Sequence, residues 1–240
     1  MCPITLNWQP TSHRPLVIAA NRDEFYVRPA LGLHHWSGQP ILAGQDLQAG
    51  GTWLGLGICS ASGRMRLAAL TNYRDIENQR MNAESRGHIT ASFLNSSLGA
   101  KDFLETLASN VSRYNPFNLI LSVSNADFNT PWPKLERLRT SFEQALSTTD
   151  DDDWLQDRLF ELLSDDNIAP DTVLPKTGIA LERERLLSAA FIHTPDYGTR
   201  ASSVIVVRQQ STAFIERGFD ADGLKDVTVE KISGGRLCLA

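Results

Sequence analysis

The chain has 240 residues, with 23 Lys and Arg against 28 Asp and Glu, which gives a formal net charge of −5. A hydrophobic fraction of 42% with 21% charged residues excludes a mainly disordered chain, and the acidic balance gives no basic surface for nucleic acid or an anionic membrane. Three scattered cysteines form no disulfide framework, and no run reaches the roughly 20 apolar residues of a membrane helix, so a reducing, cytoplasmic setting without membrane insertion is expected.

The first third of the sequence is typical of β-structure. Short runs of branched and apolar residues predict strands at residues 4–8, 15–20, 41–43, 52–58 and 66–72. A polar turn separates the first two runs, which predicts a hairpin. The second run is continuously apolar, as expected of a strand buried on both faces, and it is predicted to end in the polar cluster Asn21-Arg22-Asp23-Glu24.

The middle of the chain changes to a helical period, and its end returns to strands. Apolar spacing predicts helices over 89–109, 135–146 and 154–163, with a short strand at 117–123. Residues 182–191 read as a helix passing into a strand, and the runs 202–207, 213–217 and 227–232 as extended. This order predicts an α+β or layered architecture, and without a composition shift or a repeat we expect one domain over residues 1–240.

Four consecutive aspartates, Asp150 to Asp153, lie between two of the predicted helices. A calcium loop would need alternating ligands and a glycine, which this run lacks. Acidic residues at a helix start suit the helix dipole, so a helix N-cap or a solvated linker is the favoured interpretation.

Several common chemistries have no sequence support. The chain lacks a phosphate-binding glycine loop, a dinucleotide fingerprint, HExxH and GxSxG. His34 and His35 are adjacent, so in a strand their rings would point to opposite faces, and no further metal ligands are evident. We therefore predict no metal and no organic cofactor.

Cys2 is notable for its position directly behind Met1. Removal of the initiator Met would leave a free α-amino group on the carbon that carries the thiol side chain. An α-amine titrates near about 7.7–8.0 and a thiol near about 8.5, so the amine can accept the thiol proton, which is the logic of an N-terminal nucleophile. The alternative is a buried or incidental cysteine.

Two polar segments at predicted strand ends are candidates to support Cys2. Arg22 could lower the pKa of the thiol and Asp23 could hold the α-ammonium, because their strand would pair with the one that begins at Cys2. Asn72 could donate a hydrogen bond to a developing oxyanion. A salt-bridged turn and a turn-forming Asn are the structural alternatives.

Several segments of the chain match the motifs of a known protein family. The segments that match, in chain order, are Met1-Cys2, the run from Ala19 to Tyr26 with Arg28-Pro29, Ile41 to Gly44, Ala49 to Gly55, Ala69 to Arg74, Ser85 to Gly87, Tyr114 to Leu119, Ser124-Asn125, Thr130 to Lys134 and Tyr197 to Arg200. Together they resemble the NRDE family, also called the transport and Golgi organization 2 family. The match runs from residue 1 to about residue 217, with many colinear motifs.

The resemblance implies an N-terminal nucleophile hydrolase-like fold, a four-layer αββα sandwich of two antiparallel sheets between helices. It is similar in outline to the cysteine amidases that cleave penicillin V and conjugated bile salts. On this sequence that pattern implies Cys2 as the nucleophile, Arg22 and Asp23 as its supports and Asn72 as the oxyanion donor. Asn125 and Arg200 would contact the substrate. Trp53 is a further candidate for substrate binding, with a place in the core as its alternative.

Two departures from the amidase pattern affect this transfer. Arg22 and Asp23 are adjacent, and neighbouring side chains of an extended strand face opposite ways, so both can serve Cys2 only where the strand is bulged or ends. Between Leu119 and Asn125 the chain also lacks strand and loop residues that family members usually carry. A missing hairpin there would reshape the pocket.

Three functional hypotheses follow. The first is an N-terminal nucleophile cysteine hydrolase that cleaves a non-peptide C–N amide of a small-molecule substrate. The second is a binding or carrier protein on the same fold, because eukaryotic members of this family have been associated with Golgi organisation and haem handling. Cys2, His34 and His35 would then be candidate axial ligands. The third is a vestigial site within an interaction module.

Overall fold

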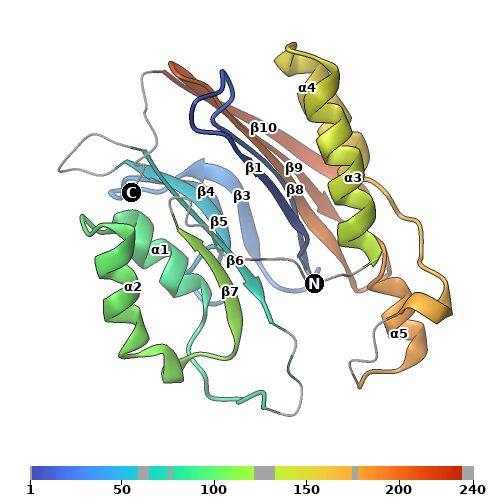
Figure 1. Ribbon diagram of the computed structural model, residues 1–240. Coiled ribbons are helices and arrows are strands. Elements are labelled where there is room, and N and C mark those ends of the chain that lie inside the picture. Colours follow the sequence, from blue (N-terminus) through green and yellow to red (C-terminus); the bar gives the residue numbers. More distant parts are fainter. Residues whose placement is uncertain are drawn as a thin grey trace. The chain divides into compact units, whose positions relative to one another are not determined.

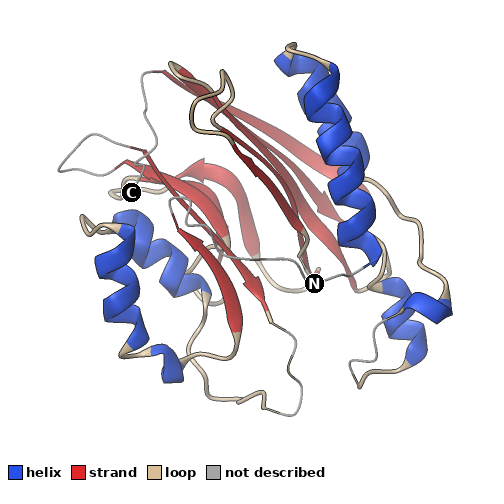
Figure 2. Cartoon of the chain, in the orientation of Figure 1, coloured by secondary structure: helices blue, strands red, loops and turns tan. Residues whose placement is uncertain are grey.

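The structure is a computed structural model that describes residues 2–58, 65–73, 75, 78–121, 133–174 and 178–233. Helices and strands both contribute substantially, which confirms the α+β class (Figures 1 and 2). In this part of the chain there are two five-stranded antiparallel sheets and five α-helices. Its contacts divide into two compact units, residues 1–27 with 127–233, and residues 28–126 with 234–240.

The first unit contains a sheet with the strand order β1-β2-β8-β9-β10. The strands are β1 (Ile4–Trp8), β2 (Leu16–Phe25), β8 (Tyr197–Val207), β9 (Ser211–Asp220) and β10 (Gly223–Ser233). The helices are α3 (Pro133–Thr148), α4 (Asp152–Leu163) and the short α5 (Leu181–Leu186). The predicted hairpin of β1 and β2 is present, with Ile4 opposite Ala20 and Trp8 opposite Leu16.

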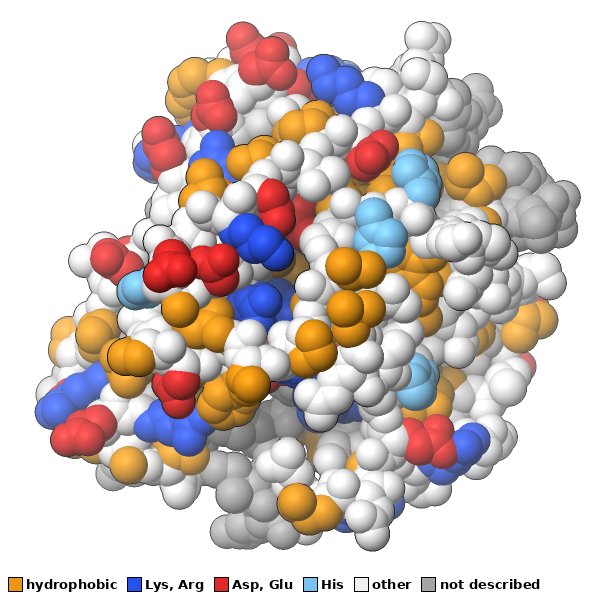
Figure 3. Space-filling view, turned by 180° about the vertical axis from the view of Figure 1, so that it is seen from behind, with side chains coloured by type: hydrophobic (Ala, Val, Ile, Leu, Met, Phe, Trp, Pro, Cys, Tyr) orange, Lys and Arg blue, Asp and Glu red, His pale blue; other side chains and the backbone are white. Residues whose placement is uncertain are grey.

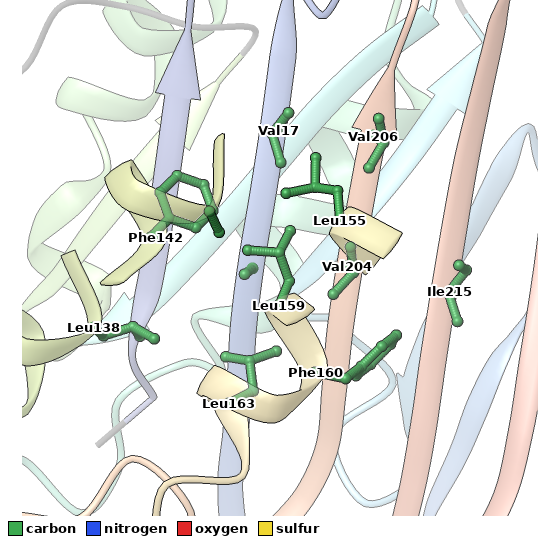
Figure 4. Close-up of a cluster of buried hydrophobic side chains, with 12 residues drawn as sticks. Val17, Leu138, Phe142, Leu155, Leu159, Phe160, Leu163, Val204, Val206 and Ile215 are labelled. Carbon is green, nitrogen blue, oxygen red and sulfur yellow. The ribbon is translucent and has the colours of Figure 1, made fainter. Parts of the chain in front are cut away.

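The core of this unit lies between the sheet and helices α3 and α4 (Figure 4). Helix α4 presents one apolar face, because its buried residues Leu155, Leu159 and Leu163 recur every four positions. They pack against alternate residues of the sheet, including Val17 of β2 and Val204 of β8. Because side chains alternate along a strand, the odd-numbered residues of β2 face the helices, and this fixes the direction of the residues that follow Val17.

The second unit contains a sheet with the order β3-β4-β5-β6-β7. The strands are β3 (Ala30–His35), β4 (Ile41–Asp46), β5 (Leu54–Ile58), β6 (Met65–Asn72) and β7 (Phe117–Leu121), and the helices are α1 (Gly87–Asn95) and α2 (Ala100–Ala108). Gly51 lies so close to this unit's own backbone that a Cβ there would meet the carbonyl carbon of Gly87 at 2.4 Å. Only glycine at position 51 permits this close approach of the two backbone segments.

Several predicted boundaries are wrong. Strand β2 does not end at the polar cluster but continues through it to Phe25, because β8 pairs with it along its whole length. The helical segment 89–109 is two helices, α1 and α2, separated by a short extended link. Residues 187–191 form no strand, and β3 was not predicted at all. The predicted end of the strand at 117–123 lies partly outside the described residues.

None of the helices in the described segments is long and apolar enough to cross a membrane. On the face seen in Figure 3, acidic and basic side chains are interspersed among the residues drawn in colour.

Candidate active site

Cys2 is held against strand β2 by the hairpin. The backbone N–H of Asn21 donates a hydrogen bond to the Pro3 carbonyl at 3.0 Å, just before Ile4, the first paired residue of β1. This contact continues the alignment of the two strands and brings Cys2 alongside Arg22 and Asp23. The sequence prediction that the hairpin delivers this cluster to Cys2 is confirmed.

The Cys2 sulfur contacts the backbone of Asp23. The Asp23 N–H donates to Sγ at 3.4 Å, and Sγ lies 3.9 Å from the Asp23 carbonyl oxygen. Burial raises the pKa of the Cys2 thiol, and the charge of the Asp23 carboxylate raises it further. The charge of the N-terminal ammonium, the Asp23 N–H donor and the charge of Arg22 lower the pKa of the Cys2 thiol, but burial and the Asp23 charge prevail. In this environment the neutral thiol is the favoured form.

The pairing of β2 with β8 is irregular between Arg22 and Asp23. Arg22 lies opposite Ala201 but Asp23 lies opposite Thr199, so Arg200 is an extra residue on β8. The extra residue belongs to β8, and β2 itself neither ends nor carries an extra residue at Arg22 and Asp23, so the expected bulge or end of β2 is not found.

The Asp23 side chain points to the helix-covered face of the sheet and is buried. Its Oδ1 accepts a hydrogen bond from Thr199 Oγ1 at 3.0 Å, and its Oδ2 lies 4.0 Å from the Lys134 ammonium of α3. Lys134 is itself only 2% exposed, and its Nζ donates to the Ala189 carbonyl at 3.2 Å. Roles for Lys134 and Thr199 were not predicted from the sequence, although both residues stand in the matched motifs.

In the matched segment Tyr197-Gly198-Thr199-Arg200, Thr199 and Gly198 both have structural roles. The Thr199 hydroxyl also accepts the Ile192 N–H at 3.0 Å, which ties the Asp23 carboxylate to the loop before β8. A Cβ on Gly198 would meet the Tyr26 hydroxyl oxygen at 2.1 Å, so only glycine lets Tyr26 pack there.

Asn21 is a structural anchor that was not predicted from the sequence. Its Nδ2 donates to the carbonyls of Leu163 and Ala190, both at 2.8 Å, and its Oδ1 accepts the Ser202 hydroxyl at 2.6 Å. It is fully buried, so these bonds satisfy its amide and fix the end of α4 to the sheet. A polar residue directly after a buried apolar run was the available signal.

Arg200 holds strand ends together. Its guanidinium donates to the carbonyls of Phe25 and Tyr26, both at 3.0 Å, and of Phe219 at 3.1 Å. Burial and the nearby charge of Arg22 lower the pKa of Arg200. These bonds tie β2 to β9 across the irregular position in β8, and the role of Arg200 in substrate binding stays a prediction.

The remaining predicted site residues belong elsewhere in the chain. Asn72 ends β6, as expected, and is exposed, and Trp53 is half-buried just before β5; both lie in the second unit, and their roles stay predictions. Asn125 lies outside the described residues. His34 and His35 lie opposite consecutive residues of β4, and His34 Nδ1 is hydrogen-bonded to the Gly32 carbonyl at 2.8 Å.

A metal centre has no ligand set in the described segments, where no group of three or more His, Cys, Asp or Glu side chains could hold an ion. The arrangement around Cys2 offers a thiol, a backbone N–H donor, the charge of the Arg22 guanidinium and, through Asp23, a buried carboxylate–ammonium pair. These groups suit nucleophilic chemistry at sulfur.

Comparison with known proteins gives a consistent result. A family model described as Transport and Golgi organisation 2 matches residues 1–123 and 120–221. The chain is 35% identical over 231 residues to the Transport and Golgi organization protein 2 homolog of Bos taurus, covering 80% of this chain and 82% of that protein. The homologs of Mus musculus and Homo sapiens are each 30% identical over the same shares.

Proposed function

Because the chain belongs to the Transport and Golgi organisation 2 family, we propose that it is an N-terminal nucleophile cysteine hydrolase that acts on a non-peptide C–N amide. The observation that carries the proposal is the hairpin that sets the Cys2 sulfur against the Asp23 N–H, beside Arg22. The proposal includes the four-layer αββα arrangement of the two sheets and their helices. It also includes a cytoplasmic location and a small-molecule substrate.

The reaction begins after removal of Met1. The free α-amine of Cys2 takes the thiol proton, and the sulfur attacks the amide carbonyl carbon. The C–N bond breaks, the leaving amine carries away a proton, and the acyl group remains on Sγ as a thioester. Water then cleaves the thioester, which releases a carboxylic acid and restores the thiol.

The α-amine of Cys2 can act as the base that its thiol needs. Burial raises the pKa of the Cys2 thiol, so without a nearby base the residue is a poor nucleophile at neutral pH. An α-amine with a pKa of about 7.7–8.0 supplies that base on the same residue. Arg22, on the neighbouring strand, stabilises the thiolate.

The test has two stages. Intact-mass measurement of the protein made in cells should show loss of Met1, and retention of Met1 would rule out the free-amine mechanism. A panel of N-acyl amides should then yield free amine with the wild type and with Cys59→Ser, a matched cysteine control, but not with Cys2→Ala. Equal release by Cys2→Ala would contradict the proposal.

A carrier function is the second candidate, and the raised pKa of the half-buried Cys2 thiol favours it, because such a thiol is unreactive on its own. In this case the protein binds haem or another small molecule without turnover, and if the cargo is haem the axial ligand is His34, His35 or Cys2, the last only in its thiolate form. Haem titration should then give a shifted Soret band that changes in Cys2→Ser. An unshifted band, together with amide turnover, would favour the hydrolase.

A further inference from the structure

The buried ion pair of Asp23 and Lys134 joins the Cys2 site to helix α3. Lys134 stands at the second position of α3, and its side chain reaches the sheet, where Nζ lies 4.0 Å from Asp23 Oδ2. The side chain of Lys134 is 1% exposed and that of Asp23 is fully buried. Removing two charges from water is costly, and a pair of this kind is weak evidence for a purely stabilising role.

Asp23 is in turn connected to the Cys2 sulfur in two ways. Its backbone N–H donates to Sγ, so any shift of Asp23 changes that contact. Its carboxylate charge also acts on the thiol, and a negative charge close to a thiol disfavours the thiolate. The side chain that fixes and compensates this carboxylate therefore influences the sulfur without touching it.

We propose that Lys134 is a positioning residue of the Cys2 site, whose ammonium compensates the Asp23 carboxylate and fixes Asp23 so that its N–H faces the sulfur. Thr199 completes the same arrangement from β8 by donating to the other carboxylate oxygen. The substrate and the reacting atoms need no contact with Lys134. The inference rests on the proposed function only in that Cys2 is the reacting residue.

Other charged and titratable groups surround this end of β2. They are Arg22 and Glu24 on β2 itself, Tyr26 after it, His193 before β8, Arg200 on β8 and Asp220 at the end of β9. Lys134 differs from these because it comes from a helix and holds the Asp23 carboxylate inside the core. A change at Lys134 therefore alters the charge beside Asp23 and leaves the rest of the cluster in place.

The experiment measures the pH dependence of alkylation of Cys2 by iodoacetamide, read on the N-terminal peptide by mass spectrometry. Lys134→Met removes the positive charge of Lys134 beside the Asp23 carboxylate, so the midpoint of the Cys2 alkylation profile should rise by about one pH unit and the rate at pH 7 should fall about tenfold. Lys134→Arg keeps the charge and should restore most of the rate. Lys101→Met removes an exposed lysine of α2 and should leave the profile unchanged.

A second pair of variants tests the role of Lys134 even where Lys134→Met does not fold. Asp23→Asn keeps Lys134 and should lower the midpoint, whereas Asp23→Asn with Lys134→Met is neutral at both positions and should titrate above Asp23→Asn. Equal midpoints for these two variants, or a folded Lys134→Met with the wild-type profile, would overturn the proposal. Alkylation needs no amide turnover, so a correct order of midpoints in a protein that cleaves no amide would reject the hydrolase function alone.

Discussion

Two clusters of charged side chains connect the helices of the first unit to its sheet, and they are built differently. At the start of α4, Asp152 bonds to Arg14 Nε at 2.8 Å and also to Arg208, while the two guanidinium groups bind the carbonyls of Thr149 and Asp150. At the other cluster, Asp23 and Lys134 are both buried and their charged atoms are 4.0 Å apart.

The difference separates a structural clamp, formed by Asp152 with Arg14 and Arg208, from the pair that we propose to position the Cys2 site. The Asp152 side chain is 26% exposed and accepts charge-assisted bonds on both oxygens, and these bonds outweigh the cost of its desolvation. The pair of Asp23 and Lys134 is fully desolvated and too long for a direct hydrogen bond, yet it lies next to the Cys2 sulfur. Strained or costly charge arrangements of this kind concentrate at functional sites.

The largest effect is expected from breaking the buried pair. Lys134→Met should lower the free energy of unfolding by about 3–5 kcal/mol, because it removes one partner of a fully buried ion pair and leaves the Asp23 carboxylate buried. Urea unfolding followed by circular dichroism measures the change. Asp23→Asn with Lys134→Met should recover most of the loss, and a double variant as unstable as the single one would show that the pair is not the cause.

A substitution in the clamp should lower the free energy of unfolding by a smaller amount. Asp152→Asn keeps the size of the side chain but removes its charge, and should cost about 1–3 kcal/mol in the same unfolding experiment. Asp153→Asn, one position later on the exposed side of α4, is the matched control and should cost well under half as much. Equal losses for the two variants would mean that the bonds to Arg14 and Arg208 contribute little.

The structural features that depend on neighbouring residues could be predicted from the sequence. The continuous apolar run from Leu16 to Ala20 gave the buried strand and its hairpin, and the acidic run before α4 was correctly assigned to a helix start rather than to calcium. Asp151 is the N-cap, and its side chain accepts the N–H groups of Asp153 and Trp154. Caps and periods are local, so the residues themselves carry the signal.

Contacts between distant segments were not predictable in this way. Lys134 follows a proline at a helix start and looks like any surface lysine, and its burial depends on how α3 packs against β2. Thr199 is unremarkable until the irregular pairing sets it opposite Asp23. Strand β3 was missed because it carries Gly32 and is largely exposed, without a clear alternation.

The clamp also predicts a pH dependence. Burial opposes ionisation of Asp152, but the hydrogen bonds from Arg208 and Arg14 prevail and hold the pKa of Asp152 below its ordinary value. A depressed pKa stabilises the folded state above the unfolded value of about 3.9 and is lost as the pH falls through the folded value. The difference in unfolding free energy between wild type and Asp152→Asn should therefore be constant from pH 7 to pH 5 and close in more acidic buffer. A gap that stays open under acid would assign it to packing rather than charge.

The smallest effect concerns the cap beside the clamp. Asp151→Ala removes the acceptor for two backbone N–H groups at the start of α4 and should cost about 1 kcal/mol. Asp151→Ser keeps a capping oxygen without the charge, so it should retain most of the stability. Because Asp151 accepts backbone donors while the neighbouring Asp152 accepts arginines, the losses from Asp151→Ala and Asp152→Asn should be close to additive in the double variant. A loss well below the sum would show that the cap positions the clamp, and that α4 is attached to the sheet through one cooperative unit rather than two.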